Sequence, residues 1–195
     1  MLGVAALLVA PLGAQTLLDR VVARVNGTTV LLSDVRAAVA VGLVEGPAES
    51  DAAVEQMVQR ALLVEEVNRF PPPEPTAEAI DAELARMRTR AGSFDDVERR
   101  TGLTGDHVRL LARDRLRIQS YIDQRFGLTV PLTDEQVLQY YRAHPEEFTV
   151  NGQVTTFERA QGLARERAGL EQRQRTITQW LRDLRSRADV AVPPR

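Results

Sequence analysis

The side chains that most often carry out chemistry are few in this sequence. It has no cysteine, which excludes a thiol nucleophile, a cysteine metal ligand and a disulfide framework. His107 and His144 are the only histidines, and neither stands in an HExxH or HxH pattern, so we expect solvated helix positions and no metal site. The acidic pairs Glu65-Glu66 and Asp95-Asp96 are adjacent, which directs the two carboxylates of each pair to different sides of a helix. With no nucleotide-binding or hydrolase motif either, the sequence predicts no catalytic site and no cofactor.

Two further patterns could serve binding. The pair Tyr140-Tyr141, beside Arg142, could stack on a base or a peptide ring, although one core residue next to a partly exposed neighbour explains it more simply. Residues 150–195 hold nine arginines against five acids. We interpret this excess as a solvated helix face, because no aromatic residues alternate with the arginines and the whole chain has a net charge of −2.

One stretch near the N-terminus predicts the scaffold that must position these side chains. Residues 21–25 and 28–30 are rich in β-branched types and flank Asn26-Gly27. Such a dipeptide is the strongest short signal for a β-hairpin, since both positions of a type I′ turn need positive φ. Ser33 offers an N-cap oxygen, and Asp34 a negative charge, to a helix that starts immediately. A two-stranded hairpin is marginal alone, so helices must cover it.

Helices are predicted over most of the remaining chain, because capping residues precede the apolar periodic runs and glycine or proline follows them. Residues 156–188 predict one long helix whose ends are apolar and whose middle, residues 171–175, is polar, so it should bridge two packing sites. Residues 189–192 predict a short strand without a local partner, which we pair with the N-terminal hairpin. The expected helices span residues 35–43, 51–69, 77–91, 94–100, 105–126, 133–144 and 156–188.

The predicted fold class is therefore mostly α: a multi-helix module with a small N-terminal β-hairpin joined by a short C-terminal strand. The 195 residues, 44% apolar and 27% charged, have an ordinary composition for a soluble protein. Residues 1–14 include an apolar run, Leu2 to Leu12, that is too short to span a bilayer, and Leu12 and Ala14 suit a signal-peptidase site. We predict a cleaved signal peptide, a mature chain from Gln15 and a periplasmic location; an uncleaved anchor or an apolar tail is the alternative.

Several segments follow one another in an order that is familiar from one family. They are VVARVNGTTVLLSDV, QMVQRALLVEEVNRF, AEAIDAELARM, FDDVERRTGLTGDHVRLLARDRLRIQSYIDQRF, LTDEQVLQYYRAHPEEF and WLRDLRSRADVAV. In this order they resemble the chaperone module of SurA-like periplasmic proteins, which are related to parvulin-type peptidyl-prolyl isomerases. The resemblance implies one helical chaperone domain over residues 15–195, with a linker helix at 133–144 and the long helix 156–188 packing back on the domain.

The chain departs from that family where the parvulin domain would be inserted. Only eight residues, TVNGQVTT, separate Phe148 from Phe157. A parvulin domain needs roughly a hundred residues, so the isomerase is expected to be absent. The short segment should instead turn at Asn151-Gly152.

What the resemblance implies is a holdase, which binds unfolded outer-membrane or secreted polypeptides in an apolar groove without ATP. A degenerate prolyl isomerase and a structural subunit of an envelope assembly are the alternatives. Neither nucleic-acid binding nor stable membrane insertion is expected. Adaptable apolar and aromatic side chains suit varied clients, although any one of them could be an ordinary core residue. The candidates for client binding are Met57, Leu84, Met87, Leu110, Tyr140 and Trp180.

Overall fold

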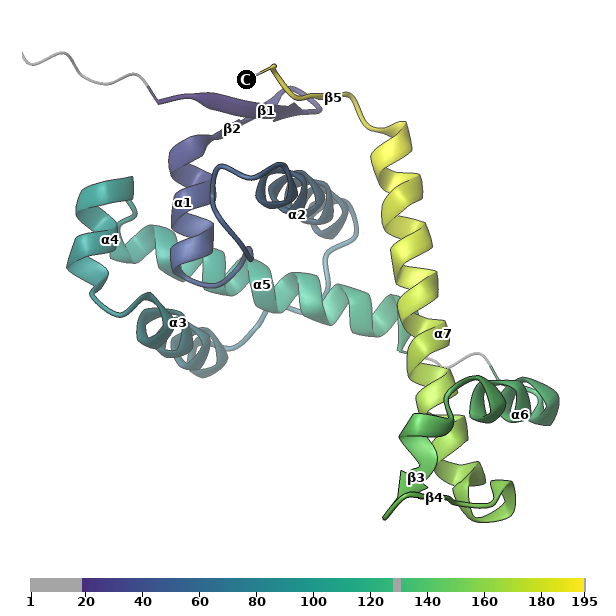
Figure 1. Cartoon of the computed structure of the whole chain (residues 1–195). Helices are drawn as coiled ribbons and strands as arrows, with labels where there is room; N and C mark the ends of the chain where they lie inside the picture. The colour runs from purple at the N-terminus through teal and green to yellow at the C-terminus, as the bar shows by residue number, and fades with distance from the viewer. Residues whose placement is uncertain (1–18, 128–130, 195) are drawn as a thin grey trace, which may run out of the picture.

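The computed structural model describes residues 19–127 and 131–194. Figure 1 shows a small sheet at one end, helices beneath it, and one long helix that leads to a second group of elements. The mostly α fold with a small N-terminal hairpin is confirmed, whereas the predicted signal peptide, residues 1–14, lies outside the described residues. In chain order the elements are β1 (Val21–Val25), β2 (Thr28–Leu31), α1 (Leu32–Ala40), α2 (Asp51–Arg69), α3 (Ala77–Ala91), α4 (Phe94–Thr101), α5 (Gly105–Phe126), α6 (Asp134–Ala143), the 3-10 helix η1 (Pro145–Phe148), β3 (Thr149–Val150), β4 (Gln153–Val154), α7 (Phe157–Arg187) and β5 (Val190–Ala191).

The N-terminal hairpin forms as its turn residues predict. Asn26 and Gly27 have φ values of 46° and 87°, which a type I′ turn requires. β1 pairs antiparallel with β2 on one side and with β5 on the other, so the strand order is β2-β1-β5. The predicted closure of the sheet by the C-terminal strand is therefore confirmed, although Val192 lies beyond the strand and is exposed.

The start of the first helix differs from the prediction. α1 begins at Leu32, so Ser33 lies inside the helix and the N-cap position belongs to Leu31. The carboxylate of Asp34 accepts the backbone N–H of Leu31 at 2.9 Å and so satisfies a donor at the helix start. The hydroxyl of Ser33 instead bonds the side chain of Asp19. The polar residues were identified correctly, but the strand continues directly into the helix and leaves no room for a serine cap.

The later helix starts follow the sequence closely. At five of them a serine or threonine oxygen accepts the backbone N–H three residues further on, which is the usual N-cap bond. At α6 the cap is a complete capping box, because the side chain of Gln136 also accepts the backbone N–H of Thr133 at 2.9 Å. The capping residues are Ser50, Thr76, Ser93, Thr104 and Thr133.

Three apolar clusters hold the body of the molecule, which we define as residues 19–127 and 171–194, and the third of them lies between α7, α2 and α5. The first lies between the sheet, α1 and α2, and includes Val25, Val35 and Val58, none of which is exposed to solvent. The second lies between α1, α3, α4 and α5. α1 contributes to both clusters, so it connects the sheet to the helices below it.

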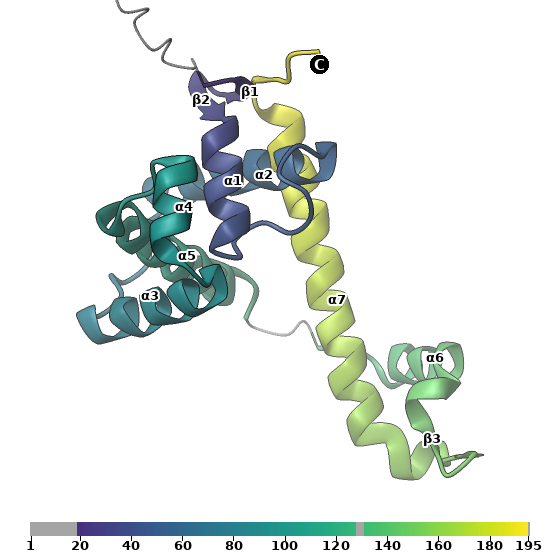
Figure 2. The ribbon, with the colours of Figure 1, turned by 60° about the vertical axis from the view of Figure 1, so that its left-hand side comes forward.

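α7 joins this body to an arm, which comprises α6, η1, β3, β4 and the first half of α7 (residues 131–170). α7 has 31 residues and spans about 46 Å. The C-terminal half packs on α2 and α5 through Trp180 and Leu184, whereas the first half packs on α6 through Ala160 and Ala164. Both views show the arm projecting away from the body (Figures 1 and 2), which confirms the predicted bridging helix. Neither α7 nor any other helix in the described residues is long and apolar enough to cross a membrane.

Candidate functional site

A groove of about 630 Å³ opens in the body between β2, α1, α2 and α5. β2 contributes Thr28 and Thr29, whose side chains are exposed at its edge. The end of α4 and the first turns of α5 close the groove on the far side. This is the volume of a typical ligand pocket.

α2 presents an apolar face to this groove. Met57, Ala61 and Val64 recur at helical spacing and are partly exposed along it. The next residues around the helix, Val58 and Leu62, are buried in the body. α2 is therefore apolar on more than one side, but one of its apolar faces is open.

α5 supplies the most exposed apolar side chain of the groove. Leu110 is 54% exposed, although Val108 and Ala112 on either side of it are completely buried. Leu111 is half-buried beside it. A large apolar side chain held in solvent at the edge of a groove gives up unfavourable hydration when a partner covers it.

One cation lies among these apolar residues. The guanidinium of Arg60 donates a hydrogen bond to the backbone carbonyl of Leu111 at 3.4 Å, which connects α2 to α5 across the groove. Burial lowers the pKa of Arg60 from its ordinary value, and Asp114 opposes this effect through its charge. Arg60 can donate hydrogen bonds to main-chain carbonyls, so the groove combines apolar contact with at least one donor for a peptide backbone.

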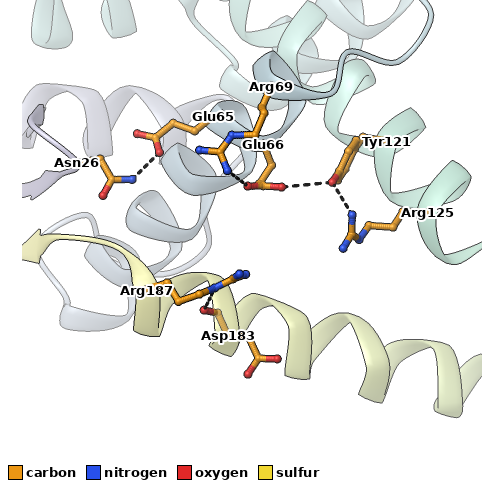
Figure 3. Close-up of polar contacts among 8 residues, drawn as sticks. All are labelled: Asn26, Glu65, Glu66, Arg69, Tyr121, Arg125, Asp183 and Arg187. Carbon is orange, nitrogen blue, oxygen red and sulfur yellow. Dashed lines mark hydrogen bonds and ion pairs between the residues drawn. The ribbon is translucent and has the colours of Figure 1, made fainter.

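A polar network on α2 ties the hairpin and α5 together next to the groove (Figure 3). The side-chain amide of Asn26 donates to Glu65, a groove residue, at 2.6 Å. On the same helix Glu66 lies 3.4 Å from Arg69 and accepts a bond of the same length from the hydroxyl of Tyr121. That hydroxyl accepts from Arg125 of the same helix at 3.1 Å. α2 is thus connected to the hairpin through Glu65 and to α5 through Glu66.

The structure does not bring the six candidate client-binding residues together. Met57 and Leu110 line the groove. Leu84 and Met87 belong to the cluster between α1, α3, α4 and α5, and Met87 is only 1% exposed. Trp180 is 9% exposed where α7 meets α2 and α5, and Tyr140 lies in the arm. Met87 and Trp180 are therefore packed as core residues, which was the alternative for any one of the six, and client binding by the others stays a prediction.

Sequence reasoning also missed residues that line the groove. Arg60, Val64 and Leu111 line it without having been selected. Only Val64 had a signal, because it ends the apolar run 62–64 and a helix cannot bury three consecutive residues on one face. Neither Arg60 nor Leu111 differs in type or spacing from residues that lie elsewhere on α2 and α5.

The two histidines occupy different environments. His107 is exposed in the first turn of α5, as predicted, and its Nδ1 lies 3.2 Å from the hydroxyl of Thr104. His144 is only half-buried, but it caps the C-terminus of α6 and stacks on Tyr140, with 4.4 Å between the ring centroids. The prediction of a simple solvated helix position is therefore wrong for His144.

Comparison of the chain with the models of known families, with curated proteins and with solved structures finds no match.

Proposed function

We propose that this protein is an ATP-independent periplasmic holdase that binds unfolded polypeptides in the groove of the body. The observation that carries the proposal is the groove itself: about 630 Å³, with Met57, Val64 and Leu110 presented by two helices. Its apolar surface suits segments that an unfolded outer-membrane or secreted protein leaves exposed. The resemblance of the chain to SurA-like chaperones supports the same function.

The proposed binding is weak enough to be reversible. Release without a nucleotide requires affinity on the order of micromolar, or about −8 kcal/mol. A shallow apolar contact of several hundred Å² supplies this once the cost of ordering the client is subtracted. Because Met57, Val64 and Leu110 are uncharged, the protein should still protect its clients from aggregation at high salt.

The proposed function does not include prolyl isomerisation. The segment between Phe148 and Phe157 forms only the short β3–β4 hairpin, in which Thr149 pairs with Val154. The proposal is therefore a binding module without isomerase activity. A refolding assay on a proline-limited substrate tests this part directly, and acceleration by the protein would contradict it.

The test of the holdase is light scattering from a denatured outer-membrane protein diluted into buffer with the purified chain, at low and high salt. Leu110→Asp should remove at least half of the protection, because it places a charge where the client is bound. Leu163→Asp is the matched control, since Leu163 is 43% exposed on α7 outside the groove. Equal loss in both variants would move the binding surface away from the groove.

Two other outcomes would replace the proposal. Protection that vanishes at moderate salt would assign binding to the arginine-rich α7. No protection at any ratio, with one stoichiometric partner in pull-downs, would favour a structural subunit of an envelope assembly.

The periplasmic location rests on the apolar run of residues 1–14 and the Leu12/Ala14 pair. N-terminal sequencing of the protein from the cell envelope should begin at Gln15 or within a residue or two. Intact Met1 on cytoplasmic protein would contradict it.

A further inference from the structure

Three potential metal ligands meet in the arm, outside the groove. His144 ends α6, and Glu146 and Glu147 follow it on η1. The imidazole Nδ1 lies 3.4 Å from Glu146 Oε1 and 3.9 Å from Glu147 Oε1. Each of the three residues offers a ligand atom, and all these atoms lie within 4.8 Å of one another. An ion with bonds of about 2.1 Å in tetrahedral geometry holds its ligands about 3.4 Å apart, so this spacing needs little adjustment.

The backbone, rather than chance rotamers, brings these ligands together. The backbone N–H of Glu147 donates to the carbonyl of His144 at 3.1 Å, which closes the turn. The hydroxyl of Thr149 donates to the carbonyl of Pro145 at 2.8 Å and fixes the next turn. The ligand at 144 is thus held near those at 146 and 147 by local structure.

A carboxylate also lies near the other nitrogen of the imidazole. Nε2 of His144 lies 3.7 Å from Glu171 Oε2 on α7. A histidine that binds a metal through one nitrogen usually donates the N–H of the other to a carboxylate or carbonyl, which fixes its tautomer. The ring of Tyr140 stacks on the imidazole from α6. Residues of α6 and α7 therefore lie against the imidazole, and Glu171 is close enough to accept from Nε2 after a small movement.

The charge around His144 also favours a cation. Glu171 pairs with Arg175 at 2.9 Å. Among the described residues, however, neither Glu146 nor Glu147 makes an ion pair with an arginine. The hydroxyl of Tyr140 donates a hydrogen bond to Glu147 at 2.9 Å. Two carboxylates consequently share one turn without an ion pair to an arginine, although Arg167 and Arg173 line the same pocket as Glu147.

We propose that His144, Glu146 and Glu147 bind a divalent transition-metal ion, with Zn²⁺ as the ion that fits best. One nitrogen and two carboxylate oxygens suit Zn²⁺ better than Mg²⁺ or Ca²⁺, which prefer all-oxygen sites. Water completes the coordination, because the side chain of Glu146 is 69% exposed. Glu171 is a positioning residue that acts through the imidazole. The bound ion would fasten η1 to the end of α6 and, through Glu171, to α7.

The test is a calorimetric titration of the intact chain with Zn²⁺, in millimolar Mg²⁺, together with NMR spectra of the two imidazoles. We expect one ion per chain and shifts in the signals of His144 alone. His144→Asn, Glu146→Gln and Glu147→Gln should each weaken binding at least tenfold, and Glu171→Gln should weaken it less than they do. His107→Asn is the matched control, since it removes the other histidine of the chain, and it should leave the affinity unchanged.

Several results would overturn the site. The proposal fails if Zn²⁺ produces neither heat of binding nor a shift of an imidazole signal. It also fails if His144→Asn still binds Zn²⁺ with unchanged affinity, or if His107→Asn weakens binding as much as His144→Asn does. If His144→Asn unfolds the arm, the affinity of the Glu146→Gln variant for Zn²⁺ becomes the test of the site. This variant removes the charge of one ligand and keeps the contact between the rings of His144 and Tyr140. Amide exchange around residues 144–150 should slow on Zn²⁺ addition in the wild-type chain and stay unchanged in Glu146→Gln.

Discussion

The β1–β2 and β3–β4 hairpins turn with the same two residues and nearly the same backbone. Asn26 and Gly27 have φ values of 46° and 87°, and Asn151 and Gly152 have values of 53° and 78°. Both turns are of the type that suits the twist of two antiparallel strands. The turn dipeptide alone therefore accounts for the existence of both hairpins.

Their surroundings differ completely. In the first hairpin Val25 is fully buried and Val30 is 4% exposed, under helices and beside a third strand. In the second, Val150 is 63% exposed and Val154 is 53% exposed, and the two strands form a sheet of their own. The comparison shows that a turn signal fixes local geometry, whereas burial by distant residues decides how much the hairpin contributes to stability.

The largest effect should come from removing the third strand of the first hairpin. Deleting residues 189–195 removes the pairing of Val25 with Val190 and two hydrogen bonds between Asn26 and Asp189, one to the backbone and one to the side chain of Asn26. We expect the free energy of unfolding, measured with urea, to fall by about 3 kcal/mol or more.

Its control lies in the second hairpin. Replacing residues 149–154 with a glycine-serine stretch of equal length should change the free energy of unfolding by less than about 1 kcal/mol, because the two exposed valines lose little burial. Comparable losses in the two variants would show that the arm and the body unfold as one unit and that burial does not separate the hairpins.

A smaller and cleaner effect comes from one valine in each hairpin. Val25→Ala removes two buried methyl groups and leaves a cavity, so the free energy of unfolding should fall by about 2 kcal/mol. Val150→Ala, at 63% exposure, should change it by less than about 0.5 kcal/mol. Thermal unfolding followed by circular dichroism would compare the two, and a destabilising Val150→Ala would reveal a partner for the exposed hairpin.

Local signals predicted most of the fold. Turn dipeptides, serine and threonine caps and the breaks at glycine and proline act within a few residues, so they can be identified without the tertiary structure. The third strand was predictable because residues 189–192 had no local partner. The exception at α1 also has a local cause: the strand runs directly into the helix, and Asp34 rather than Ser33 satisfies the amide of Leu31.

The candidate site was much less predictable, because exposure depends on how helices pack. Met57 and Met87 are the same residue type on amphipathic helices, yet one lines the groove and the other is 1% exposed. Leu110, a predicted client-binding residue, lines the groove, and so does its neighbour Leu111, which the sequence did not single out. The angle between α2 and α5 decides which faces stay open, and the sequence of neither helix encodes it alone.

The finest comparison concerns the first turn residue of each hairpin. The side chain of Asn26 accepts the backbone N–H of Asp189 at 2.9 Å and donates to Glu65 at 2.6 Å, which joins the turn to β5 and to α2. Among the described residues, the side chain of Asn151 makes no hydrogen bond. Glycine tolerates positive φ at either position, so the variants Asn26→Gly and Asn151→Gly keep both turns and carry the same extra backbone entropy.

The difference between these two variants therefore isolates the two side-chain hydrogen bonds of Asn26. One of them goes to a carboxylate, and such bonds contribute more than neutral ones. We expect Asn26→Gly to lower the free energy of unfolding by about 1.5 kcal/mol more than Asn151→Gly does. Asn26→Gly should cost nearly as much when it is made in a Glu65→Gln background. In that background the amide oxygen of Gln at position 65 can still accept the hydrogen bond from Asn26, so the substitution of Asn26 still removes it. Equal losses in the two glycine variants would mean that the conformation of the turn, rather than its connections to Asp189 and Glu65, is all that asparagine contributes at position 26.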